Sequence, residues 1–338
     1  MEALERLSRT YLPAVESELQ RMVSLSRQDG TEEMYRMLAY HMGWQGEGAG
    51  VEARGKRIRP LLVLLTCASV GGEWECALPG AAAVELVHNF SLVHDDIQDE
   101  SPLRRGRPTV WTKWGVAQAI NAGDALFTLS QMAIMNLVRC VPIEATLEAS
   151  KTLQKACLAL TQGQFLDLAY EGRLNLVVED YWRMVGGKTA ALLSACTYIG
   201  ALAGQAASDL CQLYRRFGEL LGLAFQAQDD WLGIWGNAAL TGKSTSSDLV
   251  SRKKTLPVLF GLGQQGEFAA RWALGKIQPE EAQALAEQLE REGGRAYTQE
   301  QADKLTRQAL GTLKQAQPRG EAGEALVSLT EYLLKRQH

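Results

Sequence analysis

The chain has 338 residues, of which 46% are hydrophobic, and this composition is sufficient for a sizeable core. Its 39 acidic side chains outnumber its 35 basic ones, so no basic excess is available to bind a nucleic acid backbone. The six cysteines are scattered without a CxxC pair, which argues against zinc and favours free thiols in a reducing compartment.

The N-terminus is charged from Glu2 onward and lacks the apolar segment of a signal peptide. No uninterrupted apolar run approaches the ~20 residues that span a bilayer. We therefore expect a cytoplasmic protein without a transmembrane segment.

Apolar residues recur every three or four positions along nearly the whole chain, which predicts helices. The expected helices, in chain order, cover 2–27, a stretch that begins near Pro60, 79–99, 115–139, 144–171, 178–204, 207–235, 255–264, 279–291, 298–315 and 321–336. A charged loop is expected at 236–254. Neither an alternation of period two nor an internal repeat is evident. The pattern predicts an all-α fold with one domain over residues 1–338, in which ten or more helices surround a central cavity.

A first acidic cluster ends the helix predicted at 79–99. Asp95 and Asp99 lie one turn apart on one face, with Asp96 at its edge, and Arg104 and Arg105 follow closely. Such carboxylates suit Mg²⁺, and nearby cations suit the phosphate that this ion often bridges. The alternative is a solvated acidic helix end, but the segment before the cluster is largely apolar, where an unpaired charge is costly.

A second acidic pair, Asp229 and Asp230, follows the core-like run at 220–225. Ordinary exposed charges are the alternative interpretation. As in the first cluster, polar residues lie in largely apolar helices and cations follow the acids. These residues are Gln164, Asp167, Lys188, Thr189, Gln226, Lys243 and Lys253. Together the two clusters predict a Mg²⁺–diphosphate site built from separate parts of the chain.

The chain resembles the trans-isoprenyl diphosphate synthases of the polyprenyl synthetase family from about Gly55 to Pro257. The motifs that carry the resemblance are Gly55-Lys56-Arg57-Ile58-Arg59-Pro60, Glu85-Leu86-Val87-His88, Asp95-Asp96-Ile97-Gln98-Asp99, Arg104-Arg105-Gly106-Arg107-Pro108, Gly123-Asp124, Gly163-Gln164, Lys188-Thr189, Phe225-Gln226-Ala227-Gln228-Asp229-Asp230 and Lys253-Lys254-Thr255-Leu256-Pro257. Their order and spacing are highly specific.

The resemblance implies an enzyme that joins isopentenyl diphosphate to an allylic diphosphate with about three Mg²⁺ ions. The implied metal residues are Asp95, Asp96 (more weakly), Asp99, Asp229 and Asp230. The allylic diphosphate would be held with help from Arg104, Lys188, Lys243 and Lys253. The diphosphate of isopentenyl diphosphate would be bound without metal by Lys56, Arg59, His88 and Arg105. Lys188, Lys253, Thr189 and Gln226 would lie nearest the chemistry, and the family pairs as homodimers.

The family pattern also bears on product length. Phe90, five residues before Asp95, resembles the pattern of geranylgeranyl diphosphate (C20) synthases, with Ser91 leaving room beside it and Val87 one turn earlier. An ideal helix places Phe90 about 140° from Asp95, so its blocking role rests on the resemblance and not on geometry. Plain core packing is the alternative for Phe90.

One departure is plain: the family's second motif reads DDxxD, whereas this chain has Gly233 at the third acid. Three alternatives to a C20 synthase stay open, namely a farnesyl diphosphate (C15) synthase, a class I terpene cyclase and a non-catalytic partner subunit. The intact Lys56, Arg59, His88 and Arg105 argue against the cyclase, which needs no second diphosphate site.

Overall fold

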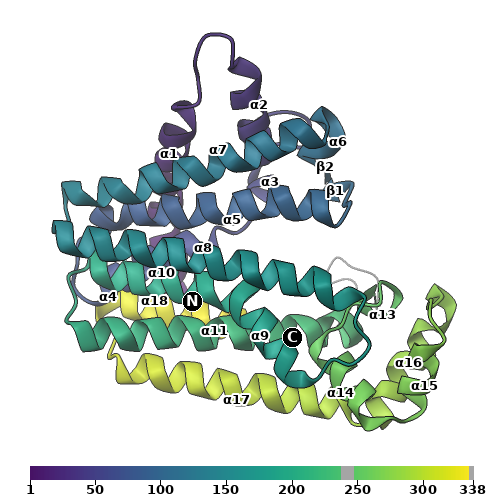
Figure 1. The fold of residues 1–338 in the computed structure, drawn as a ribbon. Helices are drawn as coiled ribbons and strands as arrows, with labels where there is room; N and C mark the ends of the chain where they lie inside the picture. Colours follow the sequence, from purple (N-terminus) through teal and green to yellow (C-terminus); the bar gives the residue numbers. More distant parts are fainter. Residues whose placement is uncertain (237–246, 335–338) are drawn as a thin grey trace. The chain divides into compact units, whose positions relative to one another are not determined.

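The computed structural model describes residues 1–236 and 247–334 (Figure 1), so Lys243 lies outside the described residues. By contacts the chain divides into two compact units. Unit 1 comprises 1–154, 195–212 and 317–326, and unit 2 comprises 155–194, 213–316 and 327–338. Whether they form the single domain predicted from the sequence stays a prediction, as does a cavity with the two aspartate helices facing each other.

The all-α prediction is confirmed. The elements are α1 (Glu2–Ser24), α2 (Glu32–His41), α3 (Val51–Arg54), α4 (Ile58–Ser69), η1 (Trp74–Ala77), α5 (Leu78–Gln98), β1 (Leu103–Arg104), β2 (Arg107–Pro108), α6 (Val110–Trp114), α7 (Val116–Met135), η2 (Asn136–Arg139), α8 (Ile143–Glu171), α9 (Val178–Val185), η3 (Gly186–Ala190), α10 (Ala191–Ala203), α11 (Ser208–Trp235), α13 (Ser247–Val250), α14 (Leu256–Gln264), α15 (Glu267–Ala273), α16 (Pro279–Arg291), α17 (Gly294–Gln315) and α18 (Gly320–Leu334).

Most predicted helices begin and end within a few residues of the observed ones. The range 178–204 is correct as helix, but a π-helical turn, η3, separates α9 from α10. The short helices α2, α3, α6, α13 and α15 were not predicted. Of the loop expected at 236–254, residues 237–246 lie outside the described residues, and α13 lies in the remainder. The small hairpin of β1 and β2, two strands of two residues each in which Arg104 pairs with Arg107, was also not predicted.

Unit 1 is organised around α5, which packs along α7 (Figure 1). The two helices approach closely at Gly123, where a Cβ atom would lie 2.1 Å from Nε2 of His94. Most of α5 is buried, from Gly80 through Val87 in an unbroken run. Residues Trp74–Gln98 are long and apolar enough to cross a membrane by length and composition, but 67% of that window is buried, as in the core helix of a soluble protein. The cytoplasmic location stays a prediction.

Unit 2 holds two apolar clusters around its share of the predicted site. One cluster includes Tyr181, Met184 and Val185 of α9 together with Leu256 and Leu259 of α14. The other joins Ile234 of α11, Leu249 of α13 and Phe268 of α15. These clusters fix the ends of α9, α11 and α14, from which the polar residues of unit 2 project.

Candidate active site

In unit 1, the last turn of α5 brings acids and an arginine of the hairpin together. The Nε atom of Arg104 donates to Oδ1 of Asp96 at 2.7 Å, and its other nitrogen lies 3.6 Å from Oδ2 of Asp95. Asp96 is buried, and desolvation raises its pKa to about 6 although Arg104 opposes the shift. Asp95 is partly exposed and Asp99, at the C-terminal end of α5, is exposed. The three predicted acids therefore lie together but in different environments.

Beside this helix end lies a cluster of cations. Burial lowers the pKa of Arg59 and of Arg105, and burial with the charges of Arg59, Arg105, Arg104 and Arg57 lowers the pKa of His88 well below its ordinary value. His88 is therefore neutral at pH 7. Lys56, the remaining predicted member, is exposed at the edge of the same segment.

Arg57 holds this segment in place, a role that the sequence did not reveal. Its guanidinium donates to Oε1 of Glu16 and to Oε1 of Glu85, each at 2.7 Å, and to the carbonyl of Met42 at 3.2 Å. Its backbone is left-handed, with φ of 48°, a conformation that a non-glycine residue keeps only where its surroundings enforce it. The two carboxylates compensate Arg57, so this arginine is a structural cation.

The remaining cations have fewer partners. Among the described residues, neither Arg59 nor Arg105 forms an ion pair with a carboxylate, and Nε of Arg59 is buried without a hydrogen bond. Arg105 donates to the carbonyl of Ala53 at 2.9 Å. Its guanidinium lies against Gly55, whose φ is 75° and where a Cβ atom would come within 2.6 Å of it. Glycine is therefore favoured at position 55 by its positive φ, and its missing side chain leaves room for the guanidinium of Arg105.

In unit 2, a chain of hydrogen bonds links η3 to α11. Oγ1 of Thr189 donates to Oε1 of Gln226 at 3.0 Å, and Nε2 of Gln226 donates to Oδ1 of Asp230 at 2.9 Å. The backbone N–H of Leu256 donates to the second oxygen of Asp230 at 3.0 Å. Asp230 is buried, and desolvation raises its pKa to about 6 against the opposing charge of Lys253. Asp229, its neighbour, is partly exposed.

Two lysines of unit 2 join this network. Nζ of Lys188 lies 2.5 Å from Oδ2 of Asp167. Burial tends to lower the pKa of Lys253, but the carboxylates of Asp230, Asp248, Asp167 and Asp229 outweigh burial and raise it. Lys253 is therefore charged, and both lysines line a cavity of about 30 Å³ that Asp167, Thr189, Gln226 and Asp230 also line.

The backbones of α8 and η3 lie in close contact, which positions Lys188 and Thr189 of η3. A Cβ atom on Gly163 of α8 would lie 2.1 Å from the backbone nitrogen of Lys188, and one on Gly187 would lie 2.5 Å from the carbonyl oxygen of Ala159. Larger residues would push α8 and η3 apart. Single π-helical turns occur often at functional sites, and here the turn carries Lys188 and Thr189.

The structure thus brings predicted residues together within each unit, and adds Arg57 and the hairpin as supporting parts. Lys254 differs from its neighbour Lys253, because its Nζ donates to carbonyls at the end of α8, including that of Glu171 at 3.1 Å. A nearly all-helical chain in which acidic helix ends lie beside clustered cations has the features of a helical diphosphate-binding enzyme.

Comparison with known proteins agrees. Residues 49–290 match the model of the polyprenyl synthetase family, and the chain belongs to this family. It is 39% identical over 316 residues to a geranylgeranyl diphosphate synthase of Mycobacterium tuberculosis, covering 90% of this chain and 87% of the relative. It is 38% identical over 314 residues to a (2E,6E)-farnesyl diphosphate synthase of Mycobacterium bovis, covering 90% and 86%. A polyprenyl synthetase structure from Streptomyces coelicolor superposes with a TM-score of 0.86 at 36% identity, covering 98% of both chains.

The protein is therefore an enzyme, a trans-prenyltransferase of the short-chain prenyl diphosphate synthase type. Such synthases use isopentenyl diphosphate and an allylic diphosphate, and the family depends on Mg²⁺ in general. The relatives carry both farnesyl and geranylgeranyl names, so the resemblance alone does not choose between the two products.

Proposed function

We propose that this enzyme joins isopentenyl diphosphate head-to-tail to an allylic diphosphate and releases geranylgeranyl diphosphate. The observation that carries this proposal is the contrast between Arg57, which is paired with two carboxylates, and Arg59 and Arg105, which form no ion pair with a described carboxylate. Arg59 is partly buried and Arg105 is exposed beside it, so this cluster keeps positive charge that is suited to an anionic ligand. A diphosphate bound there without metal supports two-substrate condensation over cyclisation of a single diphosphate.

The donor sets fit Mg²⁺. Among the described residues no three carboxylate, histidine or cysteine side chains form a closed metal cluster. Binding of Mg²⁺ does not need such a cluster, because this ion keeps several waters and commonly binds one or two carboxylates together with substrate phosphates. We assign Asp95, Asp99 and Asp229 as the principal ligands, since these are the more exposed acids of their motifs. Asp96 and Asp230 stay in the set with oxygens already engaged by Arg104, Gln226 and Leu256.

The protein's own groups then have distinct tasks. Bound Mg²⁺ would supply electrostatic stabilisation of the leaving diphosphate. Lys188, Lys253 and Arg104 add fixed positive charge where negative charge develops as the allylic C–O bond breaks. The side chains of Thr189 and Gln226 offer neutral oxygen dipoles that an allylic cation tolerates. The alkene of isopentenyl diphosphate attacks the cation, and the released diphosphate takes the proton that is lost.

We assign Phe90, with Ser91 and Val87, to the control of product length. The ring of Phe90 packs on α7, with its centroid 5.4 Å from that of Phe127 and 5.6 Å from that of His94. The hydroxyl of Ser91 donates to the carbonyl of His88 at 2.7 Å. The Ser91 side chain therefore lies against its own helix and leaves the space beside Phe90 open. Val87 is fully buried. A fixed aromatic ring beside a small residue supports a C20 product.

We also propose that the enzyme is a homodimer. Within unit 1, the segment from α7 to the start of α8 exposes large apolar side chains in succession, namely Val116, Ile120, Phe127, Met132, Met135, Val138, Ile143 and Leu147. Many exposed large apolar side chains along one segment support an interface. Light scattering on the eluting protein tests this, and a monomer at micromolar concentration would contradict it.

Product analysis tests the main proposal. Purified protein is incubated with Mg²⁺, labelled isopentenyl diphosphate and, separately, dimethylallyl, geranyl or farnesyl diphosphate, and the products are dephosphorylated and sized. We expect a C20 alcohol from each primer. A C15 alcohol would keep the synthase and discard the role of Phe90. No elongation with any primer would reject the proposed reaction.

A further inference from the structure

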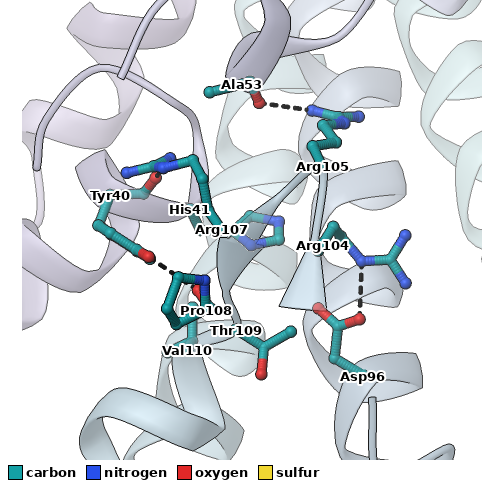
Figure 2. Close-up of a pocket in the computed structure, with 10 residues that line it drawn as sticks. All are labelled: Tyr40, His41, Ala53, Asp96, Arg104, Arg105, Arg107, Pro108, Thr109 and Val110. Carbon is teal, nitrogen blue, oxygen red and sulfur yellow. Dashed lines mark hydrogen bonds and ion pairs between the residues drawn. The ribbon is translucent and has the colours of Figure 1, made fainter. Parts of the chain in front are cut away.

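His41, the last residue of α2, has no part in the predicted site but points into it. Its side chain lines a cavity of about 20 Å³ in unit 1 together with Arg104, Arg105, Asp96 and others (Figure 2). Figure 2 shows the imidazole ring among the side chains of the hairpin arginines. No sequence signal marked this residue, because α2 itself was not predicted.

One nitrogen of His41 lacks a partner. Its Nε2 atom is buried and forms no hydrogen bond with the described residues. A buried polar atom left in this state costs about 1–3 kcal/mol, so native proteins normally satisfy it with protein or water. A polar cavity of about 20 Å³ has room for one water. The carboxylate of Asp96 and the guanidinium groups of Arg104 and Arg105 line the same space and could complete the water's hydrogen bonds.

The positive charge of the neighbouring arginines determines which side chain is suitable at position 41. Guanidinium groups only donate hydrogen bonds, so they need an acceptor behind them. A carboxylate would accept but would also cancel the positive charge that a diphosphate needs. A neutral imidazole accepts at one nitrogen and adds no charge. Burial lowers the pKa of His41 to about 3, and the charges of Arg105, Arg104 and Arg57 add to this, so the ring is neutral.

The loop after α2 is fixed well enough to hold the ring there. The guanidinium of Arg107 donates to the carbonyls of Tyr40 at 2.8 Å, Gln45 at 2.7 Å and Glu47 at 2.9 Å. The hydroxyl of Tyr40 donates to the carbonyl of Pro108 at 2.8 Å. These contacts tie the C-terminal end of α2 to the hairpin that carries Arg104 and Arg105.

We propose that His41 is a positioning residue for the metal-independent diphosphate site: through one buried water its uncharged ring orients Arg105 without cancelling the charge of that arginine. The proposal rests on the proposed function, because it concerns the binding of isopentenyl diphosphate. It predicts that position 41 requires a neutral hydrogen-bond acceptor, rather than histidine as such.

Three variants test this requirement. His41→Gln keeps a neutral acceptor, His41→Met removes it, and His41→Glu adds a negative charge at nearly the same size as Gln. We expect the KM for isopentenyl diphosphate to rise about tenfold in the Met and Glu variants and to stay within about threefold in the Gln variant. The KM for the allylic substrate should stay within about twofold in all three. Met37→Leu, a volume-conserving change at a buried position of α2, is the control for altered packing.

The outcomes separate the possibilities. If the Met variant does not fold, the comparison of Gln with Glu still decides. The inference is wrong if Gln is as damaging as Glu, if Gln does not fold, if Met and Glu leave the KM for isopentenyl diphosphate unchanged, or if both substrates are affected equally. A wild-type enzyme that makes no product would reject the proposed function instead.

Discussion

The carboxylate of Asp248 occupies the space that a side chain at position 233 would need. A Cβ atom on Gly233 of α11 would lie 2.1 Å from Oδ2 of Asp248 and 2.7 Å from its carboxyl carbon. The family's third acid is missing from the second motif at this position, and a different carboxylate of unit 2 lies there. Asp248 is also among the groups that keep Lys253 charged.

Restoring the family's acid at this position should therefore be harmful. In Gly233→Asp the new side chain collides with Asp248 and brings two carboxylates together, so we expect kcat/KM to fall at least tenfold and the thermal midpoint to fall. The double variant Gly233→Asp/Asp248→Ala should recover part of both losses. Steady-state kinetics and thermal unfolding measure them, and a single variant more active than wild type would contradict this packing argument.

The exposed acids of the two motifs should be required for turnover but not for folding. Asp95→Ala and Asp229→Ala should each lower kcat about 10²–10³-fold, the scale of losing one strong electrostatic contact in the transition state. Their partial exposure predicts little change in stability. Single-turnover rates over a range of Mg²⁺ concentrations measure the effect. Glu5→Ala, an exposed acid at the start of α1, is the control, and normal rates in Asp95→Ala would reject the metal assignment.

Removing an uncompensated cation should raise stability while it weakens binding. Arg59→Met deletes a partly buried charge whose Nε atom is buried without a hydrogen bond to the described residues, and it retains an unbranched apolar side chain. We expect the free energy of unfolding without substrate to rise by about 1 kcal/mol and the KM for isopentenyl diphosphate to rise more than tenfold. Chemical denaturation and steady-state kinetics check the two effects.

Arg57→Met provides the opposite case in the same segment. Arg57 is paired with Glu16 and Glu85, so its loss leaves the buried carboxylate of Glu85 and the partly buried one of Glu16 without their cation. Stability should then fall by about 3–5 kcal/mol, the usual result of breaking a buried ion pair. Equal effects of the two substitutions on stability would show that the division into structural and ligand-binding cations is wrong.

The helices could be predicted because apolar periodicity records burial directly. The range 79–99 and the observed Leu78–Gln98 differ by one residue at each end. The π-helical turn at Gly186–Ala190 could not be predicted, because it follows from the close contact of Gly163 with Lys188 across unit 2. The hairpin at Leu103–Pro108 is too short for any period to appear. Motifs located the acids and cations, whereas the environment of His41 exists only after α2 and the hairpin have come together.

The neutral state of His41 makes stability depend on pH. Between about pH 6.5 and pH 3 the unfolded chain binds a proton at His41 that the folded protein does not, so lowering the pH through this range destabilises the fold. The free energy of unfolding falls by about 1 kcal/mol between pH 6.5 and pH 5.5 because of this histidine. Asp96 and Asp230, whose pKa values are raised to about 6, have the opposite sign: their protonated forms favour the fold as pH falls.

A comparison isolates the histidine. Urea denaturation of wild type and His41→Gln at pH 7.5 and pH 5.5 measures how much unfolding free energy each protein loses, and the variant should lose about 1.4 kcal/mol less on acidification. The acids contribute equally to both proteins and cancel. Equal losses would show that the ring is already protonated at pH 5.5 or exposed to solvent.

The ring of Phe90 should limit the length of the product only if the growing chain reaches it. Phe90→Ala removes the ring but leaves Phe127 in place on α7, 5.4 Å away by ring centroids. We expect products longer than C20 from Phe90→Ala, because its ring then no longer limits the space for the growing chain. Chromatography of the dephosphorylated alcohols measures the distribution. Phe165→Ala, at an exposed position of α8, is the control. An unchanged product from Phe90→Ala with normal turnover would mean that this aromatic contact only packs α5 against α7.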